Sequence, residues 1–104
     1  MNGIELISFQ IISAVGTARS MYIEAIQLAK KGEFEKAEAL IKEGQETFIL
    51  GHHAHAELIQ NEASGNKTEF ALLLVHAEDQ LMSAESFGIL AEEFVDIYKK
   101  IKGE

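Results

Sequence analysis

Apolar residues recur at alternating steps of three and four along most of the chain, the rhythm of helices that pack along one stripe. The first such stretch ends at residues 30–32, where two lysines precede a glycine, and the second ends at the polar segment 63–68. Because glycine and polar clusters interrupt helices and the chain has no proline, we predict three long helices joined by two loops. Asn66 followed by Glu69 resembles a capping box, which places the start of the third helix there.

The stripes predict which positions face the other helices. In the first helix the stripe consists of Ile4, Ile7, Ile11, Ala14, Ala18, Met21, Ala25 and Leu28. In the third it consists of Phe70, Leu73, Ala77, Gln80, Ala84, Phe87, Ala91, Phe94, Tyr98 and Ile101. The second helix is less regular, with Phe34, Ala37, Ile41, Phe48, Leu58 and Ile59. Glycines within the helices are costly where exposed, so we interpret them as points of close helix approach: Gly16, Gly44, Gly51 and Gly88.

A second apolar row runs beside the first on the first helix and consists of Ile12, Val15, Tyr22, Ile26 and Ala29. One row can face the rest of the chain, whereas the other needs a further partner, and a symmetric oligomer supplies one. We therefore predict a single all-α domain over residues 1–104, built of three long antiparallel helices and assembled into a helical oligomer.

Composition narrows the possible functions. The longest uncharged run, residues 6–18, is shorter than the ~20 residues that span a bilayer, and Glu5 precedes it where a signal peptide would carry positive charge. The chain has no cysteine, so we expect a cytoplasmic protein with no membrane insertion. Seventeen acids against nine bases give a formal charge of -8, which argues against binding to nucleic acid or to anionic membranes.

His76 is the candidate for chemistry. Phosphoryl transfer through histidine needs an accessible, neutral imidazole and hydrogen-bond donors for the phosphoryl oxygens. Gln80 and Ser83 follow His76 on the same helix face and can donate. Asp79 also lies on that side, and its carboxylate would repel a phosphoryl group unless it points elsewhere, is protonated or holds a cation. The alternative is that His76 is an ordinary histidine and Asp79 part of a solvated face.

A second histidine cluster, His52, His53 and His55, suggests a metal-binding bundle because His52 and His55 are three apart. Zinc normally takes three or four close ligands, and the chain has no cysteine and one further histidine. We favour one or two of these side chains facing the bundle interior or the site of His76.

Several segments together resemble one family. These are LLLVHAEDQLM at residues 72–82, GTARS at residues 16–20, GEFEKA at residues 32–37 and EASG at residues 62–65. In order and in loop position they are similar to the lactose/cellobiose-type IIA component of the bacterial sugar phosphotransferase system (PTS), and the likeness extends over nearly the whole chain.

The resemblance implies a cytoplasmic homotrimer that accepts a phosphoryl group from the phosphocarrier protein HPr. It would pass the group to a cysteine of the cognate IIB component, for uptake of a β-disaccharide such as lactose, cellobiose or chitobiose through the membrane component IIC. His76 takes the place of the phosphorylated histidine. Asp79 takes the place of the carboxylate that meets its two copies at the trimer axis around a divalent metal ion, for which an oxygen-rich site favours Mg²⁺.

Two positions depart from the family pattern. The family commonly has histidine where this chain has Gln80 and glutamine where it has His55, while His52 lies where many members keep a histidine. The roles of His52, His53, His55 and Gln80, and the sugar served, therefore stay open. A trimeric adaptor without chemistry and a metal-binding bundle are the alternative functions.

Overall fold

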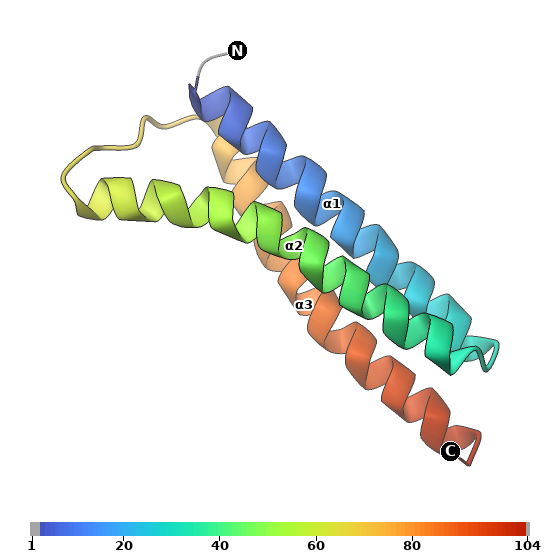
Figure 1. Ribbon diagram of the computed structural model, residues 1–104. Helices are drawn as coiled ribbons and strands as arrows, with labels where there is room; N and C mark the ends of the chain where they lie inside the picture. Colours follow the sequence, from blue (N-terminus) through green and yellow to red (C-terminus); the bar gives the residue numbers. More distant parts are fainter. Residues whose placement is uncertain (1–2, 104) are drawn as a thin grey trace.

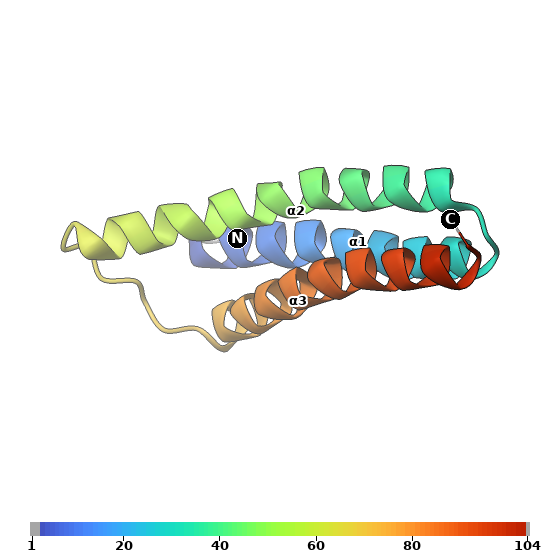
Figure 2. The same cartoon turned by 90° about the horizontal axis from the view of Figure 1, so that it is seen from below.

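The structure, a computed structural model, describes residues 3–103 as three long helices. They are α1 (Gly3–Lys30), α2 (Phe34–Ala63) and α3 (Leu72–Ile101), and they run up, down and up along a body of 54 × 24 × 18 Å (Figure 1). Seen from below, α1 lies between α2 and α3 (Figure 2). It contacts both of them more extensively than they contact each other. The predicted all-α fold of three antiparallel helices is confirmed.

Glycine ends the first two helices as predicted. After α1, Gly32 adopts φ +82°, its N–H donates to the Ala29 carbonyl, and the Glu33 N–H donates to Leu28. This is a Schellman motif, in which a left-handed residue satisfies the last carbonyls of a helix. Gly65 has the same role after α2, with φ +97°. Both loops therefore begin where the sequence placed them.

The predicted start of the third helix is wrong. α3 begins at Leu72 after an extended Ala71, which makes no side-chain cap. Asn66, expected to cap α3, instead completes the turn after α2, because its N–H donates to the Asn61 carbonyl. The end of α2 projects beyond the rest of the bundle, and the connection has to return from it to α3 (Figures 1 and 2). Residues 66–71 therefore form the connection back to α3 and are not helical.

The buried face of α2 largely follows its predicted stripe, whereas the buried faces of α1 and α3 are rotated from theirs. The buried residues of α1 are Ser8 and, from both apolar rows, Ile11, Val15, Ala18, Tyr22, Ala25 and Ala29. Those of α2 are Phe34, Ala37, Ile41, Gly44, Gly51 and Leu58. Those of α3 are Leu74, Ala77, Leu81, Ala84, Gly88, Ala91 and Val95. Of the stripe predicted for the third helix, only the alanines are buried. Phe70, which precedes α3, is 81% exposed, and Ile101 is 71% exposed. Alanines of this stripe bring the helix backbones close together, and its phenylalanines remain largely outside.

Glycines at three of the four predicted positions mark close approach. A Cβ built on Gly44 would lie 2.7 Å from Cε1 of Tyr22, and one on Gly88 would lie 2.9 Å from Cε2 on the same ring. A Cβ on Gly51 would lie 2.8 Å from the Val15 side chain. Burial raises the pKa of the Tyr22 phenol, and the Glu92 carboxylate raises that pKa further, so the hydroxyl stays neutral near pH 7. The interpretation is wrong for Gly16, which has nothing within 4 Å of an added Cβ in this chain.

Gly88→Ala should destabilise the bundle by about 1–3 kcal/mol, the usual cost of overpacking a core. The Tyr22 ring cannot move away from a new methyl group at residue 88, because Gly44 already confines it from α2. Urea unfolding would measure the change. Ser86→Ala, at an exposed position of the same helix, should stay within about 0.5 kcal/mol of wild type. Equal midpoints for the Gly88 and Ser86 variants would contradict this packing.

Much apolar surface is left outside the single chain. Exposed large apolar side chains are most frequent on α3, where they are Leu72, Val75, Met82, Phe87, Ile89, Leu90, Phe94, Ile97 and Ile101. On α1 they are Leu6, Phe9 and Ile23. None of the described helices has the length and apolar character required to cross a membrane. Such a surface is typical of a protein that binds other protein surfaces.

Candidate functional site

His76 lies on the second turn of α3 with its side chain exposed. Within residues 3–103 its ring has no hydrogen-bond or ion-pair partner. The imidazole is therefore free to approach a reacting group on another molecule. This is the first requirement for a histidine that accepts a phosphoryl group.

Gln80, one helical turn after His76, is held from α1. Nη1 of Arg19 donates to Oε1 of Gln80 over 2.7 Å, and both side chains are half-buried. Gln80 therefore faces another helix, as its place in the predicted stripe indicated, and the contact it makes there is polar. Ser83, the other predicted donor, is also half-buried on α3.

Arg19 is a site residue that was not predicted from the sequence, where it is one position of the segment GTARS. One signal marks it: Arg19 is the only Lys or Arg before Lys30. The chain also has no Lys or Arg between Thr68 and Tyr98, the stretch that contains His76. The fold brings this isolated cation to the acidic helix.

Asp79 is exposed and has no hydrogen-bond or ion-pair partner among the described residues. Its neighbours along the surface of α3, Val75 and Met82, are exposed apolar side chains. No three His, Cys, Asp or Glu side chains within residues 3–103 come together as a metal site. One chain thus offers Asp79 as a single carboxylate in an apolar surface.

The histidines of α2 are divided by the structure. Nε2 of His55 lies 2.7 Å from Oε2 of Glu78 on α3, while His52 and His53 are exposed and His52 stacks on Phe48. One of the three therefore faces the bundle, as favoured. Glu78 is two residues after His76, about 200° around the helix, so His55 lies on the flank opposite His76. The zinc alternative is not supported by this arrangement, since the described residues assemble no set of three ligands.

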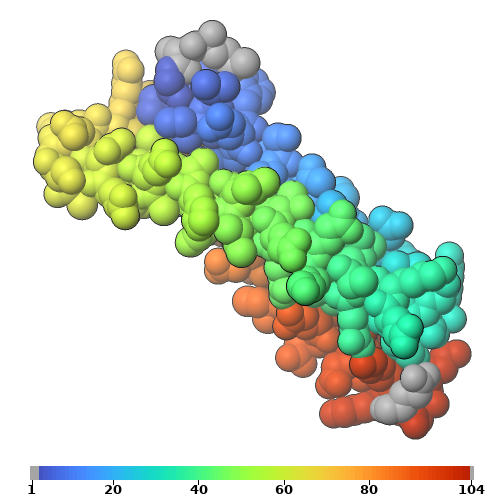
Figure 3. All heavy atoms as spheres, in the orientation of Figure 1, coloured from blue at the N-terminus to red at the C-terminus, as the bar shows by residue number. Residues whose placement is uncertain are grey.

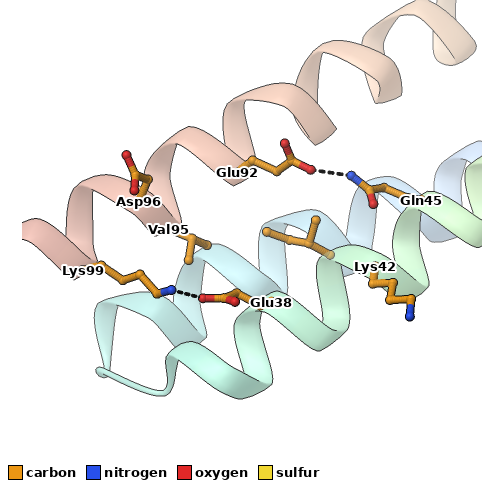
Figure 4. Close-up of a pocket in the computed structure, with 8 residues that line it drawn as sticks. Glu38, Lys42, Gln45, Glu92, Val95, Asp96 and Lys99 are labelled. Carbon is orange, nitrogen blue, oxygen red and sulfur yellow. Dashed lines mark hydrogen bonds and ion pairs between the residues drawn. The ribbon is translucent and has the colours of Figure 1, made fainter. Parts of the chain in front are cut away.

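The groove between α2 and α3 near the C-terminal end of the bundle, about 560 Å³ in volume, lies far from His76. Polar side chains from the two helices pair across it: Lys99 with Glu38, and Gln45 with Glu92 (Figure 4). Figure 3 shows α2 passing across the bundle with α3 below it. The α3 residues of the groove begin 16 positions after His76, roughly 24 Å along the helix. The groove therefore adds no group to the site around His76.

Comparison of the sequence with known proteins gives matches to one family. The profile of the family described as "PTS system, Lactose/Cellobiose specific IIA subunit" matches residues 6–99. The lichenan-specific phosphotransferase enzyme IIA component of Bacillus subtilis is 46% identical over 97 residues, covering 93% of this chain and 88% of that protein.

Solved structures agree with this match. The crystal structure of the PTS cellobiose-specific enzyme IIA from Bacillus anthracis superposes with a TM-score of 0.96 at 44% identity, covering 100% of this chain and 95% of that one. A solution structure of a IIA(chitobiose)–HPr complex from Escherichia coli gives a TM-score of 0.84 at 28% identity, with 98% and 99% coverage.

Proposed function

Since the chain belongs to the lactose/cellobiose-specific IIA family of the sugar phosphotransferase system, we propose that it carries a phosphoryl group on His76. The group comes from phosphorylated HPr and leaves to a cysteine of a IIB component. The observation that carries the proposal is the exposed imidazole of His76, which has no polar partner among residues 3–103. The relative solved in complex with HPr supports HPr as the donor, and the cytoplasm is where this exchange would take place.

The protein's main task in this chemistry is to present the His76 imidazole to its partner proteins. A nitrogen of the neutral His76 ring attacks the phosphorus, a new P–N bond forms, and the bond between phosphorus and the donor protein breaks. In the second step the IIB thiolate attacks, so that a P–S bond forms and the P–N bond to His76 breaks. Positioning and charge stabilisation dominate catalysis of phosphoryl transfer. Because His76 lies on an accessible helix face, HPr and then the IIB component can each reach it.

The working unit in this proposal is a homotrimer. Leu72, Val75, Met82 and Ile89 are exposed on α3 at the spacing of a coiled-coil seam, with Asp79 in the same row. Three α3 helices that meet along this seam would bury it. A polar residue within an apolar seam fixes the register and number of strands, which gives Asp79 a role in assembly.

A divalent metal ion fits the axis of such a trimer. A single Asp79 without a partner cannot hold an ion, but three copies around a three-fold axis supply three carboxylates. Hard cations such as Mg²⁺ prefer oxygen ligands. The ion would supply positive charge that offsets the repulsion among the three carboxylates, and Asp79 itself would provide the oxygen ligands.

The trimer predicts a solution mass of about three times the chain mass of 11.5 kDa. Leaving the apolar seam in water costs about 25 cal/mol for each Å², so the assembled state should prevail at micromolar concentration. Light scattering coupled to gel filtration would measure the mass. A single species near 11.5 kDa would remove both the trimer and the axial metal.

The sugar is a β-linked disaccharide or oligosaccharide in this proposal. The relatives are named for lichenan, cellobiose and chitobiose. Because IIA passes its phosphoryl group to a protein, its site need not contact the sugar.

The proposal is tested by incubating the wild-type protein with phosphorylated HPr and following the intact mass of each chain. We expect each chain to gain one phosphoryl group, which then moves to added IIB protein. A chain that binds HPr but gains no mass would be an adaptor instead, and the proposed function would fail.

A further inference from the structure

In the hydrogen bond between Arg19 and Gln80, the donor and the acceptor are fixed by their chemistry. A guanidinium carries only donors, so the atom of Gln80 that faces it, 2.7 Å away, has to be the carboxamide oxygen. The Nε2 amide group of Gln80 is thereby oriented away from Arg19. Within residues 3–103 this nitrogen has no acceptor, so its two N–H donors remain unused, one helical turn after His76.

The partner of Arg19 is an amide, and this leaves a charge uncompensated. No carboxylate of the described residues lies within 4 Å of the guanidinium. A glutamate at position 80 would link α1 to α3 more strongly, because a charged acceptor strengthens the hydrogen bond. It would also neutralise Arg19 and remove both N–H donors. The observed pair is therefore poorly suited to a purely structural link, in a chain with a formal charge of -8.

The Arg19–Gln80 pair lies close to His76 along the helix, where its charge and its N–H donors can act on a phosphoryl group. Gln80 follows His76 by four residues, so their Cβ atoms lie about 5–6 Å apart on one helix face. A phosphoryl group on the imidazole adds negative charge at that place, on a helix without any cation between Thr68 and Tyr98. Arg19 is the cation that the fold brings to this part of α3.

We propose that Arg19 and Gln80 form a brace for the phosphoryl group on His76. Arg19 holds the Gln80 carboxamide by its oxygen, Nε2 of Gln80 donates to a phosphoryl oxygen, and the guanidinium offsets the added charge. The brace rests on the proposed function of His76, since it acts only when that residue is phosphorylated. Arg19 and Gln80 are positioning residues here, because the reacting nitrogen belongs to His76.

Substitutions at Gln80 separate this role from a structural one. Gln80→Met keeps the length of the side chain and removes the donors without adding charge. Gln80→Glu keeps, and strengthens, a partner for Arg19 but also removes the donors. If the contact served only to join α1 to α3, Gln80→Glu would be at least as stable as wild type and just as active. If the brace acts on the phosphoryl group, Gln80→Glu should be as stable as wild type but impaired in phosphoryl transfer.

The experiment measures the rate of phosphoryl acceptance from phosphorylated HPr and the hydrolysis rate of the purified phosphoprotein. Gln80→Met and Gln80→Glu should lower the acceptance rate by about 10- to 100-fold, the effect of losing one hydrogen bond to a charged group. Both phosphoproteins should hydrolyse at a changed rate. Gln80→His retains an N–H donor and should restore most of the acceptance rate. Arg19→Lys, which keeps the charge but not the planar fork, should fall between wild type and Arg19→Met.

Gln60→Met is the matched control, since Gln60 is exposed near the end of α2 and should behave as wild type. Far-UV circular dichroism and light scattering confirm that each variant keeps its fold and assembly state. Wild-type rates in a folded Gln80→Met protein would overturn the brace and leave the proposed function intact. A wild-type protein that accepts no phosphoryl group would overturn the proposed function, and the brace with it.

Discussion

His76→Ala should abolish phosphoryl acceptance from phosphorylated HPr while leaving the helical bundle intact. The side chain is exposed and contacts no described polar group, so its removal should change the free energy of unfolding by no more than about 0.5 kcal/mol. Alanine has no ring nitrogen at this position, so no bond to phosphorus can form. Intact-mass measurement after incubation would show no gain, and the far-UV spectrum should stay helical.

The remaining histidines provide the matched controls. His53→Ala removes an exposed histidine from α2 and should leave acceptance unchanged. His55→Ala breaks a partly exposed pair with Glu78, which should cost at most about 1 kcal/mol of stability without blocking acceptance. If the His76 variant still gained a phosphoryl group that is labile in acid, another residue would be the acceptor.

Chelation should lower the melting temperature of the wild-type trimer, and Asp79→Leu should make stability independent of the chelator. A ligand present at 100 times its Kd stabilises the folded state by about 2.7 kcal/mol, which an axial ion would contribute and a chelator would remove. In the leucine variant the three carboxylates are absent, so neither the ion nor the repulsion remains. Calorimetry with and without chelator would measure both effects.

Asp79→Asn tests whether assembly and chemistry are separate. This variant keeps an oxygen ligand and loses the charge, so it should still accept a phosphoryl group on His76. A folded, trimeric Asp79→Asn protein that cannot be phosphorylated would place Asp79 in the catalytic machinery. A wild-type melting temperature that does not respond to chelator would contradict the axial ion.

The sequence predicted the elements well where a local conformation decides them. The cap after α1 follows from Gly32, whose positive φ costs glycine nothing. The cap before α3 failed because Asn66 can serve either flanking helix, and only the path of the connection decides between them. Such a path is set by tertiary packing and does not appear in a short motif.

The sequence predicted the buried faces less well for a different reason. Apolar spacing marks every surface of a helix that is kept from water, whichever chain covers it. Phe87 and Phe94 were placed in the core, yet each is about 40% exposed in the single chain, as expected if a second copy covers them. Ala84 and Ala91 are buried because their small size admits a neighbouring helix. Hydrophobicity alone does not rank alanine above phenylalanine for that role.

The site was predictable in part. His76, Asp79 and Gln80 lie on one helix, so their spacing shows that they are neighbours. The contact of Gln80 with Arg19 joins residues 61 positions apart and depends on how α1 and α3 are aligned. No local pattern contains that alignment, although the scarcity of cations around Arg19 was a usable signal.

Locating the phosphoryl group in the wild-type protein shows whether His76 is the acceptor. After incubation with phosphorylated HPr, fragmentation under mildly alkaline conditions keeps the acid-labile P–N bond intact. We expect the phosphoryl group on the imidazole of His76, in the peptide that spans the start of α3, with His52, His53 and His55 unmodified. A phosphoryl group on any other residue, or on none, would contradict it.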